Sequence, residues 1–74
     1  MSNLDWLQSL VGSRVQSTLS DSRRVVGHVA CIDGSGNLLI LGAQEWIGSQ
    51  ERYVGLVLVP AQHLLKLEVA NAHH

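Results

Sequence analysis

Cysteine is almost absent from this 74-residue sequence: Cys31 is the only one, which excludes an internal disulfide. Its place in an apolar segment predicts a buried, reduced thiol of a cytosolic or nuclear protein; a reactive or metal-bound thiol is the alternative. A chain of this length forms one domain near the lower limit for independent folding. A single core of that size supplies only about 3–5 kcal/mol of net stability.

Charge is also scarce. Charged residues make up 15% of the chain, against roughly 25% in an average soluble domain. Five Lys or Arg and six Asp or Glu leave a formal net charge of −1. A nucleic-acid-binding domain usually presents a basic face, so direct RNA binding is not expected. Apolar residues reach 46%, more than so small a domain can hide, and we expect some of them to form a partner-binding patch.

Targeting and membrane segments are missing as well. No apolar run approaches the roughly 20 residues that span a bilayer. The N-terminal segment contains Asp5 and has no cleavable apolar core, so we expect no signal peptide. His73 and His74 at the end of the chain are consistent with a purification-tag remnant and are left out of the fold prediction.

The residues needed for catalysis or metal binding are not clustered. His28 and Cys31 lie three apart in a predicted strand, which would put them on opposite faces. One cysteine and strand histidines offer no nucleophile and base. The segment Gly34-Ser35-Gly36 leads into another strand rather than a helix, unlike a phosphate-binding loop. We therefore expect no catalytic, cofactor-binding or metal-binding residues, and no enzyme activity of the chain by itself.

The central segment, Arg24 to Leu41, predicts a hairpin. Apolar residues rich in Val and Ile flank the turn Asp33-Gly34-Ser35-Gly36, and Asn37 opens the second strand. Gly27, inside the first strand, predicts a bulge or a sharp bend. Because a long strand bent at glycine lets a short antiparallel sheet curl, the expected architecture is a small barrel.

The remaining periodicity completes a single domain over residues 1–72. We predict a helix over about 3–11, with a capping box from Ser2 to Asp5, and strands over about 13–19, 23–33, 37–46, 52–59 and 63–69. The segment between residues 46 and 52 is predicted as loop. The continuous apolar run 52–59 is typical of a strand buried on both faces, so its outer face implies a partner. Pro60 must end that strand.

Two spacings resemble a known family. Gly27, Asp33 and Asn37 are similar to the first motif of the Sm and Sm-like (LSm) proteins. Gly55 to Val59, a break, and His63 to Val69 resemble the second motif. The resemblance covers residues 3 to 70 and implies the Sm-like fold: a mainly β structure in which a short N-terminal helix precedes a strongly bent, five-stranded antiparallel SH3-like barrel.

The chain departs from that family where RNA is bound. RNA-binding members carry Arg-Gly at the break of the second motif, where this sequence has Pro60-Ala61. They also place a stacking side chain in the turn, where Gly34-Ser35-Gly36 offers none. Base recognition in single strands depends on stacking, so the RNA pocket is expected to be missing. Asp33 and Asn37 are then expected to tie the backbone of the turn.

One branch of the family fits better. Ala43-Gln44-Glu45 followed by an aromatic residue, then Arg52, Val59-Pro60 and His63, resemble the small LSm-domain auxiliary subunit of the NatC N-terminal acetyltransferase. This resemblance implies a non-catalytic cytoplasmic subunit whose partners are a large auxiliary subunit and a catalytic acetyltransferase subunit. The catalytic subunit uses acetyl-CoA to acetylate protein N-termini at the ribosome. Its acetyl-CoA and peptide sites are not carried over to this chain, and an RNA-binding LSm ring subunit is the alternative.

LSm domains assemble by pairing the edge strands of the open barrel. The strands over 52–59 and 63–69 are the most apolar and are expected at an edge. Trp6 is predicted either to cover the barrel end or to contact another chain. A free peptide-binding SH3-like module is disfavoured, because three aromatic residues cannot line a groove. The partner-interface candidates are Trp6, Trp46, Tyr53, Leu56, Leu58, Leu65 and Leu67, and the fold-motif residues are Gly27, Asp33, Asn37, Gly55 and Pro60.

Overall fold

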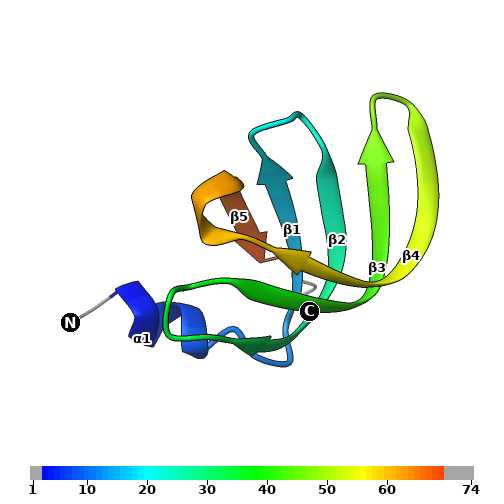
Figure 1. Ribbon diagram of the computed structural model, residues 1–74. Helices are drawn as coiled ribbons and strands as arrows, with labels where there is room; N and C mark the ends of the chain where they lie inside the picture. The colour runs from blue at the N-terminus through cyan, green and yellow to red at the C-terminus, as the bar shows by residue number, and fades with distance from the viewer. Residues whose placement is uncertain (1–2, 70–74) are drawn as a thin grey trace.

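The computed structural model describes residues 3–69 of the chain (Figure 1). Its elements are α1 Asn3–Gln8, β1 Arg14–Leu19, β2 Arg24–Ile32, β3 Leu38–Ile47, β4 Gln50–Val59, the 3₁₀ turn η1 Ala61–His63 and β5 Leu64–Val69. The expected cap at Ser2 and the residues His73 and His74 lie outside the described residues. Within the described range, neither helical segment has the length or hydropathy to cross a membrane.

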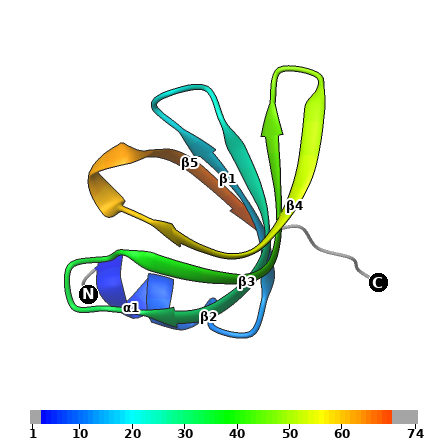
Figure 2. The same cartoon turned by 45° about the vertical axis from the view of Figure 1, so that its right-hand side comes forward.

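The five strands form one sheet in the order β4-β3-β2-β1-β5, and every neighbouring pair is antiparallel. The sheet curls strongly, so that β5 and the bent part of β4 come round toward each other while the β3–β4 hairpin projects beyond them (Figures 1 and 2). The strands β4 and β5 are the two edges of the sheet. A mainly β fold with a short N-terminal helix is therefore confirmed.

The bend depends on a close backbone approach at Gly27. A Cβ atom there would lie 2.6 Å from Ile40 Cγ2 and 2.7 Å from the Leu41 carbonyl oxygen, so only glycine fits. The β2–β3 register shifts between Val26 and His28. Gly55 in β4 has a φ of +90°, a conformation that glycine adopts without strain. These positions let long strands turn a corner.

The core lies on the concave side of the sheet. Its buried members are Leu10, Val15, Leu19, Val25, Val29, Ile32, Leu38, Ile40, Ala43 and Val59, and Leu7, Val57, Leu64 and Leu67 pack against them. The helix α1 lies beside the end of β2, where the Gln8 side-chain amide donates a 3.0 Å hydrogen bond to the Ile32 carbonyl. Through Leu7 and Leu10, the N-terminal segment closes one end of this core.

The predicted helix over 3–11 was too long. After Gln8 the chain continues in tighter turns, in which the Leu10 amide donates to the Leu7 carbonyl at 2.9 Å. Gly12 has a φ of +91° and donates its amide to the Val29 carbonyl at 2.8 Å. The hydrogen bond to the sheet redirects the chain one turn earlier than periodicity predicted, and Val11 is left exposed.

The predicted loop between residues 46 and 52 was also too long. β3 runs to Ile47 and β4 begins at Gln50, with only Gly48 and Ser49 between them. Ile47 pairs with Gln50 across this hairpin, and Gly48 has a φ of +62°. A two-residue hairpin turn favours glycine where φ is positive. Gly48 therefore marks the turn within a segment in which apolar and polar residues do not alternate.

Two bulges reverse the predicted faces of residues. The register shifts between Val29 and Cys31, so Ala30 is an extra residue and alternation restarts after it. Cys31 is therefore exposed, not buried, and shares the solvent face with His28 instead of opposing it. The residues are nevertheless not part of any cluster of three or more potential metal ligands within residues 3–69.

The second bulge lies in β5, opposite β1. Leu19 pairs with Leu64, whereas its neighbour Thr18 pairs with Lys66, so Leu65 is the extra residue. Leu64 and Leu67 pack against the core, whereas the inserted Leu65 is exposed. Simple alternation would put Leu65 and Leu67 on one face, because it does not anticipate a bulge.

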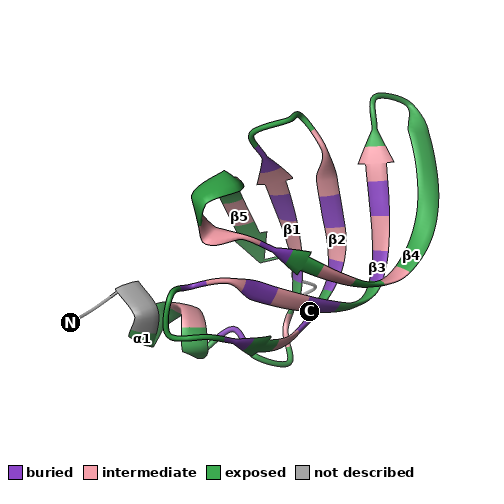
Figure 3. Ribbon diagram, viewed as in Figure 1, coloured by how far each residue is buried: buried purple, intermediate pink, exposed green. Residues whose placement is uncertain are grey.

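The strand β4 is not buried on both faces within this chain (Figure 3). Val57 and Val59 point toward the core, while residues 50–54, Leu56 and Leu58 are exposed. The sheet supplies no layer over the outer side of β4. Any second buried face must come from another polypeptide.

Candidate subunit interface

The turn between β2 and β3 uses its polar groups internally. Asp33 Oδ1 accepts hydrogen bonds from the Ser35 amide at 2.8 Å and the Asn37 amide at 3.0 Å. Asp33 Oδ2 accepts a further bond from Asn37 Nδ2 at 2.8 Å. The bond from the Asn37 side chain, followed by those from backbone amides, lowers the pKa of the Asp33 carboxyl. The two side chains tie the turn as expected.

The other end of the Asn37 amide is also occupied, because Asn37 Oδ1 accepts the Ala61 backbone amide at 2.8 Å. The adjoining hollow has a volume of about 410 Å³ and is lined by Ser35, Asn37, Leu58, Pro60, Ala61 and Gln62. None of these lining residues is aromatic or charged. The hollow therefore lacks an aromatic ring or guanidinium on which a base could stack, and the Asn37 side chain is engaged in holding the second motif against the first.

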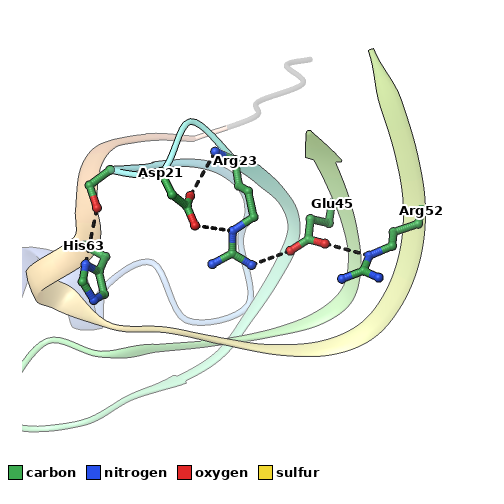
Figure 4. A network of polar contacts seen from close by, with 6 residues as sticks. Asp21, Arg23, Glu45, Arg52 and His63 are labelled. Carbon is green, nitrogen blue, oxygen red and sulfur yellow. Dashed lines mark hydrogen bonds and ion pairs between the residues drawn. The ribbon is translucent and has the colours of Figure 1, made fainter. Parts of the chain in front are cut away.

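A second polar group lies inside the barrel, near the β3–β4 hairpin (Figure 4). Glu45 is only 2% exposed, and its two oxygens each contact an arginine at 2.7 Å, Arg23 Nη1 and Arg52 Nε. Arg23 Nε also contacts Asp21 Oδ2 at 2.7 Å. The bond from Arg52, followed by that from Arg23, lowers the pKa of the Glu45 carboxyl against the opposing effect of burial.

This ion network has a structural consequence. It connects the β1–β2 turn to β3 and β4 on the concave side, where β4 pairs only with β3. Both Glu45 oxygens are occupied by arginines, and the lowered pKa makes this carboxylate a weak base, so it is unsuited to accept a proton in catalysis. The sequence pattern alone does not predict this network. The available signal was the position of Glu45, two residues after the buried Ala43 on the inward face.

The structure leaves most of the predicted interface residues accessible. Trp6, Tyr53, Leu56, Leu58 and Leu65 are exposed, and Tyr53 is the most open of them at 72%. Trp46 is half-buried, with the Arg24 guanidinium carbon 5.4 Å from its ring centroid. Leu67 is half-buried and packs against the core, unlike the exposed Leu65.

The accessible residues gather on the edges of the sheet. Tyr53, Leu56 and Leu58 belong to β4, and Leu65 belongs to β5. Val54 and Val69 add further exposed apolar surface to the same two strands. Edge strands present unpaired backbone donors and acceptors, and apolar side chains beside them are typical of surfaces that bind another protein.

No protein-family model matches the sequence. A Drosophila melanogaster protein named N-alpha-acetyltransferase 38, NatC auxiliary subunit, is 31% identical over 65 residues, which cover 85% of this chain and 54% of the relative. A chain in the crystal structure of the NatC complex bound to Gag peptide and CoA is 30% identical. That match covers 85% of this chain and 89% of the solved one, with a TM-score of 0.78.

The chain belongs to the NatC auxiliary subunit family. This family assignment confirms the resemblance found in the sequence. The P. aerophilum SmAP1 heptamer superposes with a TM-score of 0.86 at 25% identity, covering 97% of both chains, which confirms the Sm-like fold. The chain spans about half to two thirds of the length of the curated relatives it matches. Those relatives are named as auxiliary subunits, in agreement with the expectation that the chain is not an enzyme by itself.

Proposed function

We propose that this chain is a non-catalytic auxiliary subunit of a NatC N-terminal acetyltransferase. In this role it binds a large auxiliary subunit and a catalytic acetyltransferase subunit, and stabilises them for co-translational acetylation of protein N-termini. We further propose that it works in the cytoplasm and meets the ribosome only through that complex. Membership of the NatC auxiliary family supports the assignment.

The observation that carries the proposal is the exposed apolar surface of edge strand β4. Tyr53 is 72% exposed and Leu58 is 60% exposed on a strand whose other edge is paired with β3. Fully burying one leucine or aromatic side chain contributes roughly 1.5–3 kcal/mol. Residues of this kind on an unpaired edge favour a permanent protein partner over solvent.

Co-expression with the two partner subunits tests the proposal. The chain should co-elute with them in size-exclusion chromatography, whereas the chain expressed alone should aggregate or be poorly soluble. The assembled complex should acetylate a peptide N-terminus in the presence of acetyl-CoA, and the chain alone should not. A monodisperse monomer that ignores both subunits would contradict the proposal.

An RNA-binding LSm ring subunit is the second candidate, favoured by the close superposition on the SmAP1 heptamer. Binding of that kind requires contact with phosphates and stacking of bases. The hollow beside Asn37 provides neither an arginine nor an aromatic ring. Filter binding of U-rich and A-rich single strands at two salt concentrations should show no specific retention. Tight retention that falls steeply with salt would favour the ring.

A further inference from the structure

Four leucines line up across β3 and β4 on the outer face of the sheet. Leu41 pairs with Leu56 and Leu39 pairs with Leu58 in the ladder. They alternate with the core-facing residues Leu38, Ile40, Val57 and Val59, so all four point outward. Leu41, Leu56 and Leu58 are 49%, 55% and 60% exposed, and Leu39 is half-buried. We call Leu39, Leu41, Leu56 and Leu58 the outer leucine patch.

The two rows of this patch continue onto β2 and β1. Leu39 pairs with Cys31, and Leu41 pairs with His28. His28 in turn pairs with Arg14 on β1. Cys31, His28 and Arg14 are all exposed. One row therefore runs from a cation through an imidazole to two leucines, and neither row contains a carboxylate.

The apolar surface stops at the bend. Closer to the hairpin tips the outer face becomes mainly polar, in rows of paired residues: Glu68, Gln16, Val26, Gln44 and Tyr53, then Lys66, Thr18, Arg24, Trp46 and Glu51. Ile47 is also exposed, at 51%, but lies at the hairpin tip beyond these rows. The outer leucine patch is thus a bounded surface with a basic border on one side.

Resting on the proposed function, we propose that the outer leucine patch seats an amphipathic helix of a NatC partner subunit. The helix sets an apolar stripe on the leucines and directs a carboxylate to Arg14 and His28. An apolar sheet face is buried most readily by a helix packed across it, because helix and sheet layers are complementary. Residues spaced at i, i+3, i+4 and i+7 supply a stripe of the required width.

Charge complementarity distinguishes this occupant from others. A second copy of the chain, applied face to face, would bring no carboxylate from these rows to Arg14. A strand added to β4 would pair with the backbone of its edge and leave the side chains of the face uncovered. An acidic amphipathic helix would cover the leucines with its apolar stripe and place a carboxylate beside the basic border. The outer leucine patch is continuous with the free edge of the sheet, since Leu56 and Leu58 belong to the edge strand β4.

Photo-crosslinking in the assembled complex tests the contact directly. Benzoylphenylalanine replaces Leu41 in one preparation and Ile47 in the other, and the crosslinked peptides are sequenced by mass spectrometry. The probe at position 41 should capture a partner segment with helical apolar spacing and at least one acidic residue. The probe at position 47 should not capture that segment. A crosslink from position 41 to a second copy of this chain, or to an extended segment, would overturn the proposal.

Affinity measurements supply the matched variants. Leu41→Gln combined with Leu56→Gln should weaken assembly by at least about tenfold, as expected for central interface leucines, and Ile47→Gln should not. Arg14→Glu should weaken it by several-fold at low salt and less at high salt, while Lys66→Glu on the far border should not. Circular dichroism of each variant confirms that it folds.

The outcomes separate this inference from the proposed function. A complex that forms with wild-type affinity despite both leucine changes overturns the helix seat and leaves the auxiliary role standing. Failure of the wild-type chain to bind either partner overturns both. Weakening by the leucine changes without the crosslink at position 41 also overturns the seat, because the effect then arises from elsewhere.

Discussion

Each half of β3 contains a side chain that departs from the usual preference for burying apolar residues and exposing charged ones. In the half near the hairpin, the charged Glu45 is 2% exposed; in the bent half, the apolar Leu41 is 49% exposed. Glu45 is buried because two arginines of the same chain satisfy both of its oxygens. Leu41 lies on the outer face, where it pairs with Leu56 and His28 and no layer covers it within this chain. The contrast teaches that this chain satisfies the buried Glu45 with its own arginines and leaves Leu41 on the surface, where the proposed partner would cover it.

Replacing Gly27 by alanine should distort the bend that separates the two halves of β3. The new methyl group would meet Ile40 Cγ2 at 2.6 Å and the Leu41 carbonyl at 2.7 Å, and a backbone atom cannot move aside cheaply. We expect the free energy of unfolding to fall by about 3 kcal/mol in urea denaturation followed by circular dichroism.

Gly34→Ala is the matched control, because a Cβ atom there meets nothing within 4 Å. Its unfolding free energy should stay within about 0.5 kcal/mol of the wild type. Equal stability of the two variants would show that β2 and β3 do not approach as closely as described.

Glu45→Gln tests the hairpin half. Two arginines would lose their shared carboxylate, and breaking a buried ion pair costs about 3–5 kcal/mol. Because both arginine side chains are partly exposed, at 36% and 69%, their hydration offsets part of that loss. We expect destabilisation of about 2 kcal/mol in the same urea titration. Glu51→Gln, which alters one exposed contact to Gln44, should have little effect, and a comparable loss there would contradict the network.

Acid should act on the same carboxyl. The pKa of Glu45 lies below its ordinary value of 4.5 in the folded chain, so the unfolded chain takes up the proton first as the pH falls. The stability that Glu45 contributes is present above that ordinary value and is lost as the pH falls through the folded pKa. Thermal unfolding between pH 7 and pH 3 should show this decline. Glu45→Gln should flatten the curve, and an unchanged slope would mean that other carboxyls account for it.

The smallest change in stability is expected in the bent half. Leu41→Gln with Leu56→Gln should alter the unfolding free energy by no more than about 0.5 kcal/mol per site, because both side chains are already half in solvent. Self-association of the isolated chain in sedimentation velocity should decrease. Leu38→Gln, one residue before the patch but fully buried, should be far more damaging. Comparable damage from both would show that the patch is part of the core.

Much of the fold was predictable because its signals are local. The turn around Asp33 and Asn37 consists of residues whose side chains bond nearby amides. The bend at Gly27 follows from a glycine inside an apolar strand. The absence of an arginine at Pro60 and of a stacking side chain in the turn needs no structure to be recognised. These features were sufficient to favour a protein-binding role over base recognition.

The burial of individual side chains was less predictable, because it depends on the partner strand. Alternation along β2 and β5 predicts one face for each residue, but the bulges at Ala30 and Leu65 restart the count. Cys31 and Leu65 are exposed for this reason. The network around Glu45 joins residues from the β1–β2 turn and from two strands, and no short window of sequence contains all of them.

The sequence by itself determined which segments extend, where they turn and that the nucleotide-binding side chains are missing, since each depends on the chemistry of neighbouring residues. Only the tertiary structure decided which apolar residues remain outside. That choice depends on strand register and on inserted residues such as Ala30 and Leu65, each of which reverses the faces of the residues that follow it. The same register aligned four leucines beside a basic border and enclosed a carboxylate between two arginines.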